Sequence, residues 1–186
     1  LPVLETLHLH EPAAGPDGVP RLAEKLGAGA LPAVTVLRLY NTHVGDTGAS
    51  ALAAALGRGA MPRLKILGLN NTAIGDAGLV ALAPALRRLP ALEFLSLGYN
   101  PLGDDGLAAL VAPPPAGAPP PPTGGLAKLK GLNLMGTQIA DEGCATLASA
   151  LDSDALPALE HLDLYAIPAS DAAKAAVQRA GLQVER

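Results

Sequence analysis

Two histidines near the start of the chain have a spacing that metal sites use. His8 and His10 form a His-x-His pair, and residues two apart on an extended strand point to the same side. Glu5 and Glu11 lie close to them in the sequence. The next strand-like segment places Arg38 beside His8, and a fixed cation there opposes the binding of a second cation. We therefore expect no metal ion and no cofactor.

Regularly spaced aspartates and a single cysteine are the other candidates for chemistry. The spacing of the aspartates suggests a cation site, but each one precedes a helix-like segment. There its carboxylate can accept hydrogen bonds from the free amides of the first turn, so we expect helix capping. Cys144 lies at a predicted helix start, but its repeat contains no histidine, so we expect a packing residue. The aspartates are Asp46, Asp76, Asp104, Asp141 and Asp171.

The segments that must position these residues contain a repeated motif, Leu-x-x-Leu-x-Leu. It recurs about every thirty residues, which is typical of an array of supersecondary units that bury their apolar faces against one another. The anchoring triplets are Leu4/Leu7/Leu9, Val34/Leu37/Leu39, Leu64/Leu67/Leu69, Leu92/Leu95/Leu97, Leu129/Leu132/Leu134 and Leu159/Leu162/Leu164.

One unit, residues 31–60, shows how each repeat is expected to fold. Residues 36–39 alternate inward and outward and predict a short strand. Asp46 is predicted to cap the helix of its own repeat, which begins at Thr47. The inward stripe of this helix is predicted to be Gly48, Leu52 and Leu56.

The extended motif, LxxLxLxxT-x-(I/V/L)-G-D-x-G-x-x-x-L-x-x-x-L, resembles the ribonuclease-inhibitor-like class of leucine-rich repeats. The repeat domains of NOD-like receptors and of the Ran GTPase-activating protein belong to that class. The match covers the chain except for about residues 113–125. The resemblance implies an α/β fold, a right-handed leucine-rich repeat solenoid that forms a segment of a horseshoe. Its parallel β-sheet would line the concave face and its helices the convex face.

We expect one domain, 1–186, of about six repeats. It opens directly on an ordinary repeat, so we expect it to be a fragment of a longer chain. The proline-rich segment 112–125 should end one helix about a turn early; we favour a tolerated insertion over an SH3- or WW-type ligand. The last repeat is expected to be a cap, in which residues 181–185 can add a short strand. The predicted repeats are 1–30, 31–60, 61–88, 89–125, 126–155 and 156–186.

One position of the repeat departs from the pattern of the class. Where the class has asparagine or cysteine, this chain has Pro12, Thr42, Thr72, Asn100, Thr137 and Ile167. An asparagine amide donates two hydrogen bonds and a threonine hydroxyl only one. We therefore expect the ladder of side-chain hydrogen bonds between repeats to hold in the middle of the array and to fail at both ends.

The aromatic residues are confined to positions that face outward from the predicted sheet. These are the second, third, fifth, seventh and eighth positions of each LxxLxLxx motif. Aromatic side chains on a rigid sheet offer large contact areas at low entropic cost, as in interaction hot spots. Strand propensity is the alternative explanation, and we favour binding. The four aromatic residues of the chain are Tyr40, Phe94, Tyr99 and Tyr165.

Other outward positions add an apolar strip and a mixture of charges. Val36 and Ile66 precede Phe94 at the third position of successive repeats. A surface with charges of both signs suits a protein partner better than a phosphate backbone. The polar candidates for partner binding are His8, His10, Arg38, Asn70 and Asp163.

Composition excludes several classes of function. The net charge of −4 argues against nucleic acid as a partner, because non-specific affinity for it comes from excess Lys and Arg. Apolar runs are broken before the ~18 residues that a membrane span needs, so we expect no membrane insertion. A single cysteine favours a reducing, intracellular compartment, which we take to be the cytoplasm.

Three hypotheses about function follow. We favour a non-catalytic protein-interaction module that binds a protein partner on its concave face. The first alternative is a structural subunit of a large assembly, held through its edges or convex face. The second, a GTPase-activating regulator, rests only on the resemblance to the Ran GTPase-activating protein. No nucleophile–base pair, phosphate loop or paired carboxylate pocket stands out in the sequence, so we do not expect an enzyme.

Overall fold

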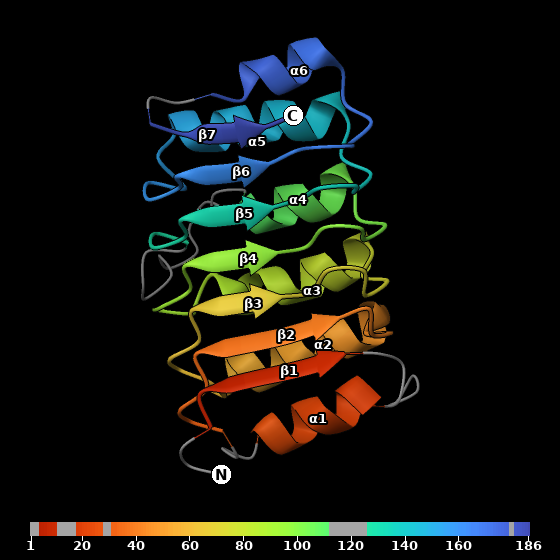
Figure 1. Cartoon of the computed structure of the whole chain (residues 1–186), viewed down its shortest axis with the longest axis vertical. Helices are drawn as coiled ribbons and strands as arrows, with labels where there is room; N and C mark the ends of the chain where they lie inside the picture. The colour runs from red at the N-terminus through yellow and green to blue at the C-terminus, as the bar shows by residue number, and fades with distance from the viewer. Residues whose placement is uncertain (1–3, 11–17, 28–30, 112–125, 179–180) are drawn as a thin grey trace, which may run out of the picture.

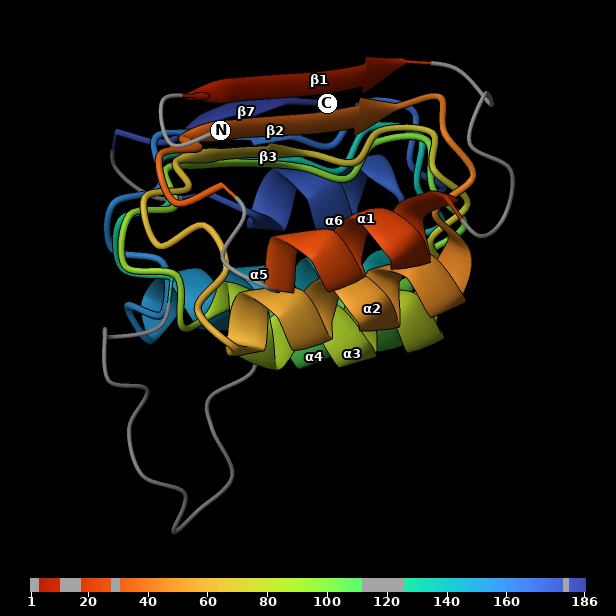
Figure 2. The same cartoon turned by 90° about the horizontal axis from the view of Figure 1, so that it is seen from below.

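The computed structural model describes residues 4–10, 18–27, 31–111, 126–178 and 181–186. Strands and helices alternate along the chain and form two layers, a sheet and a row of helices packed against one of its faces (Figures 1 and 2). The strands are β1 (Thr6–His10), β2 (Val36–Tyr40), β3 (Ile66–Gly68), β4 (Phe94–Ser96), β5 (Gly131–Asn133), β6 (His161–Asp163) and β7 (Gln183–Glu185).

The helices differ in length. Helix α4 spans eight described residues, Asp104–Val111, and α3 spans eleven. The segment 112–125, with the proline motif and the predicted early end of this helix, lies outside the described residues. The helices are α1 (Gly18–Gly27), α2 (Gly45–Gly57), α3 (Asp76–Leu86), α4 (Asp104–Val111), α5 (Asp141–Asp152) and α6 (Asp171–Ala176).

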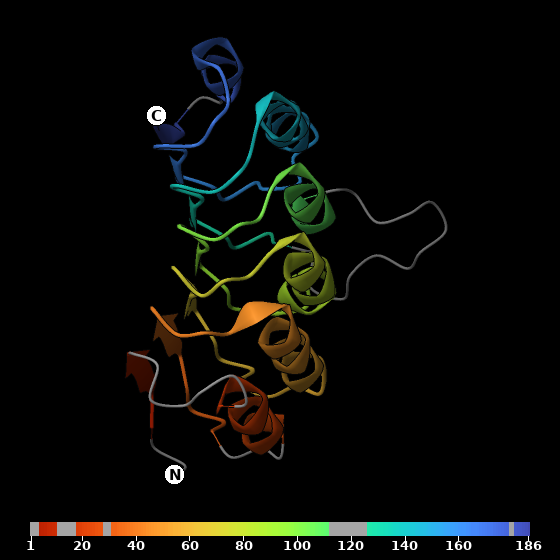
Figure 3. The same ribbon diagram turned by 90° about the vertical axis from the view of Figure 1, so that its right-hand side faces the viewer.

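All strands of the sheet are parallel and follow one another in sequence order, so each repeat adds one strand beside the previous one. The sheet curves so that its free face is concave, and the helices lie on the convex side (Figure 3). The predicted α/β solenoid with a concave parallel sheet is confirmed. The final strand, β7, pairs with β6 as residues 181–185 suggested.

Leucines from strands and helices fill the space between the two layers. The residue thirteen positions after the last strand leucine is buried in five successive repeats. The predicted inward stripe of α2 is also buried, and none of the four aromatic residues lies in the core. The buried helix anchors are Leu52, Leu82, Leu110, Leu147 and Val177, each at most 1% exposed.

The aspartates cap helices, but the prediction that each caps the helix of its own repeat is wrong. Asp46 lies inside the first turn of α2, and its Oδ1 accepts hydrogen bonds from the amides of Gly75 (2.8 Å) and Gly78 (3.0 Å), which begin α3. Asp76 bonds in the same way to Gly103 and Gly106 at the start of α4. Each carboxylate therefore ties one repeat to the next.

The two later aspartates repeat this contact with small changes. Oδ1 of Asp104 accepts from the amide of Ala140, which precedes α5. Asp141 accepts from the amide and the hydroxyl of Ser170. Ser170 in turn accepts from the amide of Ala173, so at the last repeat a serine relays the cap.

Glycines leave the space that this inter-repeat cap needs. A Cβ on Gly78 would lie 2.5 Å from Oδ1 of Asp46, and a Cβ on Gly106 would lie 2.6 Å from Oδ1 of Asp76. At Gly143 the distance to Oδ1 of Asp104 would be 2.3 Å. The glycine two residues after each aspartate therefore leaves room for the carboxylate of the preceding repeat.

Asn100 is the strongest member of the polar ladder. Its Nδ2 donates to the carbonyls of Leu69 (2.6 Å) and Leu97 (2.8 Å), and its Oδ1 accepts from the amides of Thr72 (3.0 Å) and Ile74 (3.1 Å). The hydroxyls of Thr42 and Thr137 instead donate to a carbonyl three residues back, within their own repeat. Among the described residues the ladder therefore joins repeats at Asn100 and Thr72, a narrower part of the array than predicted. At the C-terminal end Ile167 is buried and apolar; Pro12 lies outside the described residues.

The structure predicts that Gly78→Ala and Gly57→Ala have opposite effects. The Cβ at position 78 would collide with Asp46 and Ile74 and displace the cap, at a cost of about 1–3 kcal/mol in unfolding free energy. Gly57 ends α2 with no atom within 4 Å of an added Cβ, so alanine there should be neutral or stabilise by up to ~1 kcal/mol. Urea unfolding followed by circular dichroism measures both; equal stability of the two variants would contradict the inter-repeat cap.

Candidate functional site

The concave face carries an apolar strip along the third position of the repeats. Val36 pairs with Ile66 and Ile66 with Phe94 in the register of the sheet, so their side chains follow one another across β2, β3 and β4. Val36 and Ile66 are half-buried, and Phe94 is 41% exposed. The same register position is occupied by Gly131 on β5 and by His161 on β6.

A groove of about 230 Å³ lies beside Phe94 on this face. It crosses from β3 to β7, and its volume is below the ~300–1,000 Å³ typical of small-molecule sites. The groove therefore suits one or two side chains of a macromolecule better than a cofactor. Its lining includes Ile66, Phe94, Gly131, His161, Asp163 and Glu185.

Three of the aromatic rings pack on glycines of the next repeat. A Cβ on Gly131 would lie 2.5 Å from Cδ1 of Phe94, so the phenyl ring occupies the space that the glycine leaves open. Tyr40 covers Gly68 in the same way, with Cε1 at 2.4 Å from that Cβ position. Each ring thus has one side against the sheet backbone, which holds it in place.

The third ring belongs to Tyr99, and its backbone is unusual. Cδ1 of Tyr99 lies 2.7 Å from the Cβ position of Gly136. Tyr99 has φ of 56°, in the left-handed region that asparagine tolerates better than tyrosine. The same eighth position in other repeats has φ of 55° at Asn41, 51° at Asn71 and 57° at Ala166. This turn is therefore a feature of the repeat that Tyr99 accepts in spite of its bulk.

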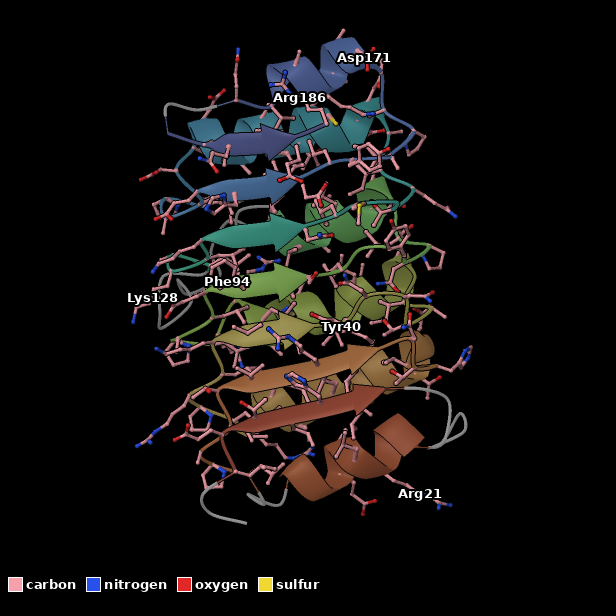
Figure 4. The ribbon with its side chains drawn as sticks, viewed as in Figure 1. Arg21, Tyr40, Phe94, Lys128, Asp171 and Arg186 are labelled. Carbon is pink, nitrogen blue, oxygen red and sulfur yellow. The ribbon has the colours of Figure 1, made fainter. Side chains whose placement is uncertain are left out.

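Tyr40 and Tyr99 flank a second, wider hollow of about 480 Å³. Asparagines line it between the two rings: Nδ2 of Asn71 donates to Oδ1 of Asn41 at 2.9 Å, and Oδ1 of Asn70 is buried without a hydrogen-bond partner. Phe94 begins β4 whereas Tyr40 ends β2, so the groove and this hollow extend toward opposite ends of the strands (Figure 4).

Tyr165 lies apart from the other three aromatics. It is 57% exposed and lines neither the groove nor the hollow. Its amide donates to Oδ1 of Asp163 (3.0 Å), and its carbonyl accepts from the amide of Gly136 (2.9 Å). The structure therefore brings three aromatic side chains into two neighbouring depressions and leaves the fourth on the same face beyond them.

Arg38 lies beside His8, as expected from the positions of the two residues in successive repeats. Nη1 of Arg38 lies 2.9 Å from Nε2 of His8, and the two residues are register partners on β1 and β2. His10 ends β1, but its side chain and all of Glu11 lie outside the described residues. Within the described part of the chain, no group of three or more His, Cys, Asp or Glu could hold a metal ion.

The repeats match a known family along much of their length. Four segments, residues 32–53, 61–83, 89–111 and 125–148, match the Leucine Rich repeat family. The chain is a leucine-rich repeat protein. Repeats of this family suggest a protein–protein interaction module.

A solved structure shares this fold at low sequence identity. Leiomodin-1 Actin-Binding Site 2 has a TM-score of 0.63 and 16% identity, over 87% of this chain and 84% of that one. An internalin from Listeria monocytogenes str. 4b F2365 has a TM-score of 0.49 and 18% identity, over 98% of this chain and 47% of that one. No curated protein sequence matches. None of the helices in the described ranges combines the length and apolarity that crossing a bilayer requires.

Charges follow the leucine-rich repeat strands along the second position. The carboxylate of Glu93 lies between the amino groups of Lys65 (3.5 Å) and Lys130 (3.3 Å). The hydrogen bond from Lys130 is the largest effect and lowers the pKa of Glu93 below its ordinary value. Desolvation raises the pKa in part, and the positive charges of Lys130 and Lys65 lower it again. These lysines are therefore engaged within the leucine-rich repeat chain itself.

The C-terminal end of the concave face is acidic. Asp163 on β6 accepts from Nδ2 of Asn133 through Oδ2 (3.0 Å), and it pairs in register with Glu185 on β7. Asp163 is half-buried and Glu185 exposed. The opposite end of the leucine-rich repeat face, at β1 and β2, carries Arg38 beside His8.

Cys144 is a packing residue, as expected. It is fully buried in α5, and burial raises the pKa of its thiol, with the nearby carboxylates of Asp141 and Asp104 raising it further. A thiol held in the neutral form inside the core is a poor nucleophile.

Sequence reasoning found the aromatic residues of this surface but missed the glycines beneath them and the acidic pair. Gly131 and Gly136 each stand one repeat after an aromatic residue at the same position of the motif. The aromatic residue and its glycine therefore fall in the same column when the repeats are aligned in the sequence. Glu185 was missed because residues 183–185 continue the sheet without a Leu-x-x-Leu-x-Leu motif.

We predict that the two lysines affect the titration of Glu93 unequally. Lys130→Met should raise the pKa of Glu93 more than Lys65→Met, because Lys130 contributes the larger hydrogen-bond effect and the larger charge effect. High salt should also raise it by screening both lysines. Because the folded pKa is depressed, the stabilisation is present above the ordinary pKa and is lost as pH falls through the folded value. NMR of the side-chain carboxyl carbon gives the pKa of Glu93 in the parent chain and in each of the two variants. A larger effect of Lys65→Met than of Lys130→Met would contradict this arrangement.

Proposed function

We propose that this chain is a non-catalytic recognition module whose concave face binds a protein partner. The observation that carries the proposal is the position of the exposed aromatic side chains. Phe94, Tyr99 and Tyr165 are 41%, 53% and 57% exposed, and all three lie on the concave side, together with the half-buried Tyr40. Aromatic side chains are the usual centres of protein-binding energy, because they give large contact areas with few rotatable bonds.

The distribution of exposed apolar side chains favours this face over the convex one. Among the described residues, Val80 on α3 is the large hydrophobic side chain that is exposed on the helical layer, at 49%. The other exposed large side chains belong to the sheet layer and its loops. A structural subunit held through its helices would need an apolar patch there, so this distribution supports recognition over the structural hypothesis.

Strand propensity alone does not account for the aromatic residues. Packing on Gly68 and Gly131 explains one side of the rings of Tyr40 and Phe94, because a ring over a glycine shields the sheet backbone. It does not explain why the outer side of Phe94 borders a groove. A ring fixed on one side and accessible on the other loses little entropy when a partner binds.

The proposed contact surface includes polar residues around the aromatic centre. Val36 and Ile66 extend the apolar strip beside Phe94, and charged and amide groups surround it. A polar rim around an apolar centre is the ordinary anatomy of an interface. The proposed binding residues are Tyr40, Phe94, Tyr99, Tyr165, Val36, Ile66, Arg38, Asn70, His8, His10 and Asp163.

We further assign the repeats to the ribonuclease-inhibitor-like class, on their length of about thirty residues and the helix in each unit. The similar leiomodin-1 structure is titled an actin-binding site, so a solenoid of this fold presents a protein-binding surface in that protein. At 16% identity this supports the kind of function and not the partner.

The test replaces the aromatic residues by residues that this chain already uses at the same positions. Tyr40→Asn follows Asn70, Phe94→Thr follows Thr6, and Tyr99→Asn follows Asn41 and Asn71. The triple variant should fold, since asparagine relieves the left-handed backbone at position 99 and Tyr99→Asn alone should change stability by less than ~1 kcal/mol. In affinity capture from cell extract, quantified by mass spectrometry, we expect the triple variant to lose the partner at least tenfold.

Val80→Gln serves as the matched control, because it removes an exposed apolar side chain from the convex face and keeps a good helix former. It should retain the partner. Circular dichroism and thermal unfolding verify that both variants are folded. Retention of the partner by the triple variant and its loss by Val80→Gln would place the interface on the helices and refute concave recognition.

A further inference from the structure

Two carboxylates at one end of the groove lack a positive partner. Asp163 and Glu185 are neighbours in register on β6 and β7, and both line the groove that contains Phe94. Among the described residues neither one forms an ion pair. Like charges on adjacent strands repel each other, so a cation supplied from outside would be stabilised at this place.

Cations elsewhere on the concave face contact other groups, and Arg186, which directly follows Glu185, forms no ion pair among the described residues. Lys65 and Lys130 both contact Glu93 at the second position of the repeat. Arg38 contacts His8 at the far end of the sheet. The carboxylate oxygens of Asp163 accept hydrogen bonds from Asn133 and from the amide of Tyr165, both neutral donors that fix the carboxylate without cancelling its charge.

Apolar and acidic parts of the groove are continuous. Ile66, Phe94 and Gly131 form its apolar part on β3–β5, and Asp163 and Glu185 form its acidic part on β6–β7. We propose that the groove binds an extended segment of a partner protein that carries an apolar or aromatic residue followed or preceded by a lysine or arginine. This rests on the proposed function of the concave face. The apolar side chain packs against Phe94, and the basic side chain reaches Asp163 and Glu185.

The geometry of the sheet sets the spacing within such a segment. β4 and β6 are two strands apart, which is roughly 10 Å because neighbouring strands lie ~4.8 Å apart. An extended chain advances ~3.3 Å per residue, so it covers this distance in about three residues. The basic residue is therefore expected about three positions from the apolar one, in either chain direction.

Charge also decides between kinds of occupant. A phosphate backbone is repelled by the two carboxylates, and the volume of about 230 Å³ admits side chains rather than a typical small molecule. A basic and apolar peptide segment satisfies both parts of the groove. Across the interface, the charge complementarity should contribute specificity and a salt-dependent association rate.

The experiment selects twelve-residue linear peptides from a phage-displayed library against the folded chain. The enriched peptides are then synthesised, and their binding affinity is measured by fluorescence anisotropy. We expect enrichment of an apolar or aromatic residue with Lys or Arg about three positions away. Replacing that basic residue by Gln should weaken binding at least tenfold. Glu185→Lys should do the same, whereas Glu160→Lys, an equal charge change at an exposed residue outside the groove, should have less than a threefold effect.

The other outcomes separate this inference from the proposed function. Peptides that need Phe94, as shown by loss of binding to the Phe94→Thr variant, but lack a basic residue and ignore Glu185→Lys would overturn the charge inference and leave concave recognition intact. Peptides insensitive to both variants, or a library without enriched peptides, would also overturn the inference. In those cases the capture experiment with the aromatic triple variant decides separately whether the concave face binds a protein.

Discussion

The structure depends on one contact between repeats, the hydrogen bonds from a helix N-terminus to an aspartate of the preceding repeat. The free amides of a helix start need acceptors, and Asp46 supplies one for α3 as Asp76 does for α4. The glycine three residues into each of these helices lets the carboxylate approach. Because the same contact recurs, each helix is fixed against its neighbour at the same height. The strands attached to these helices consequently enter the sheet in a constant register.

Constant register separates the residues that hold the fold from those available for recognition. Leucines at the fourth and sixth motif positions are buried in every central repeat, so they are restricted to apolar residues. The third, fifth and seventh positions face away from the helices and vary freely, from Val36 and Ile66 to Phe94 and His161. The aromatic rings use this freedom and remain tied to the sheet through glycines one repeat later. The backbone positions are therefore fixed, while the side chains on the free face of the sheet can differ between repeats without altering the core.

Periodicity predicted the fold because each repeat presents the same apolar positions, and it misassigned the caps for the same reason. An aspartate at the start of one helix lies one period before the start of the next, so a repeating pattern cannot tell a contact within a unit from a contact between units. The sequence therefore predicts that Asp46 caps its own helix, whereas the carboxylate bonds to the start of the next one. The aromatic residues could be predicted because they depart from the pattern. Of their glycine partners, Gly131 stands at the motif position of Phe94 one repeat later, so aligned repeats reveal it. Gly68 stands at a different motif position from Tyr40 and could not be predicted until the ring is placed over it.

The acidic end of the groove follows from a related asymmetry. In the middle of the array Glu93 lies between Lys65 and Lys130 on the neighbouring repeats, and these two positive charges compensate its negative charge. Asp163 instead has the neutral Asn133 on one side and a second carboxylate, Glu185, on the other. Two like charges on adjacent strands lower the stability of the sheet and add nothing to the core, so the carboxylates do not stabilise the chain on its own. Their value lies in a cation from another molecule, and the adjacent apolar groove supplies the remaining part of such a contact.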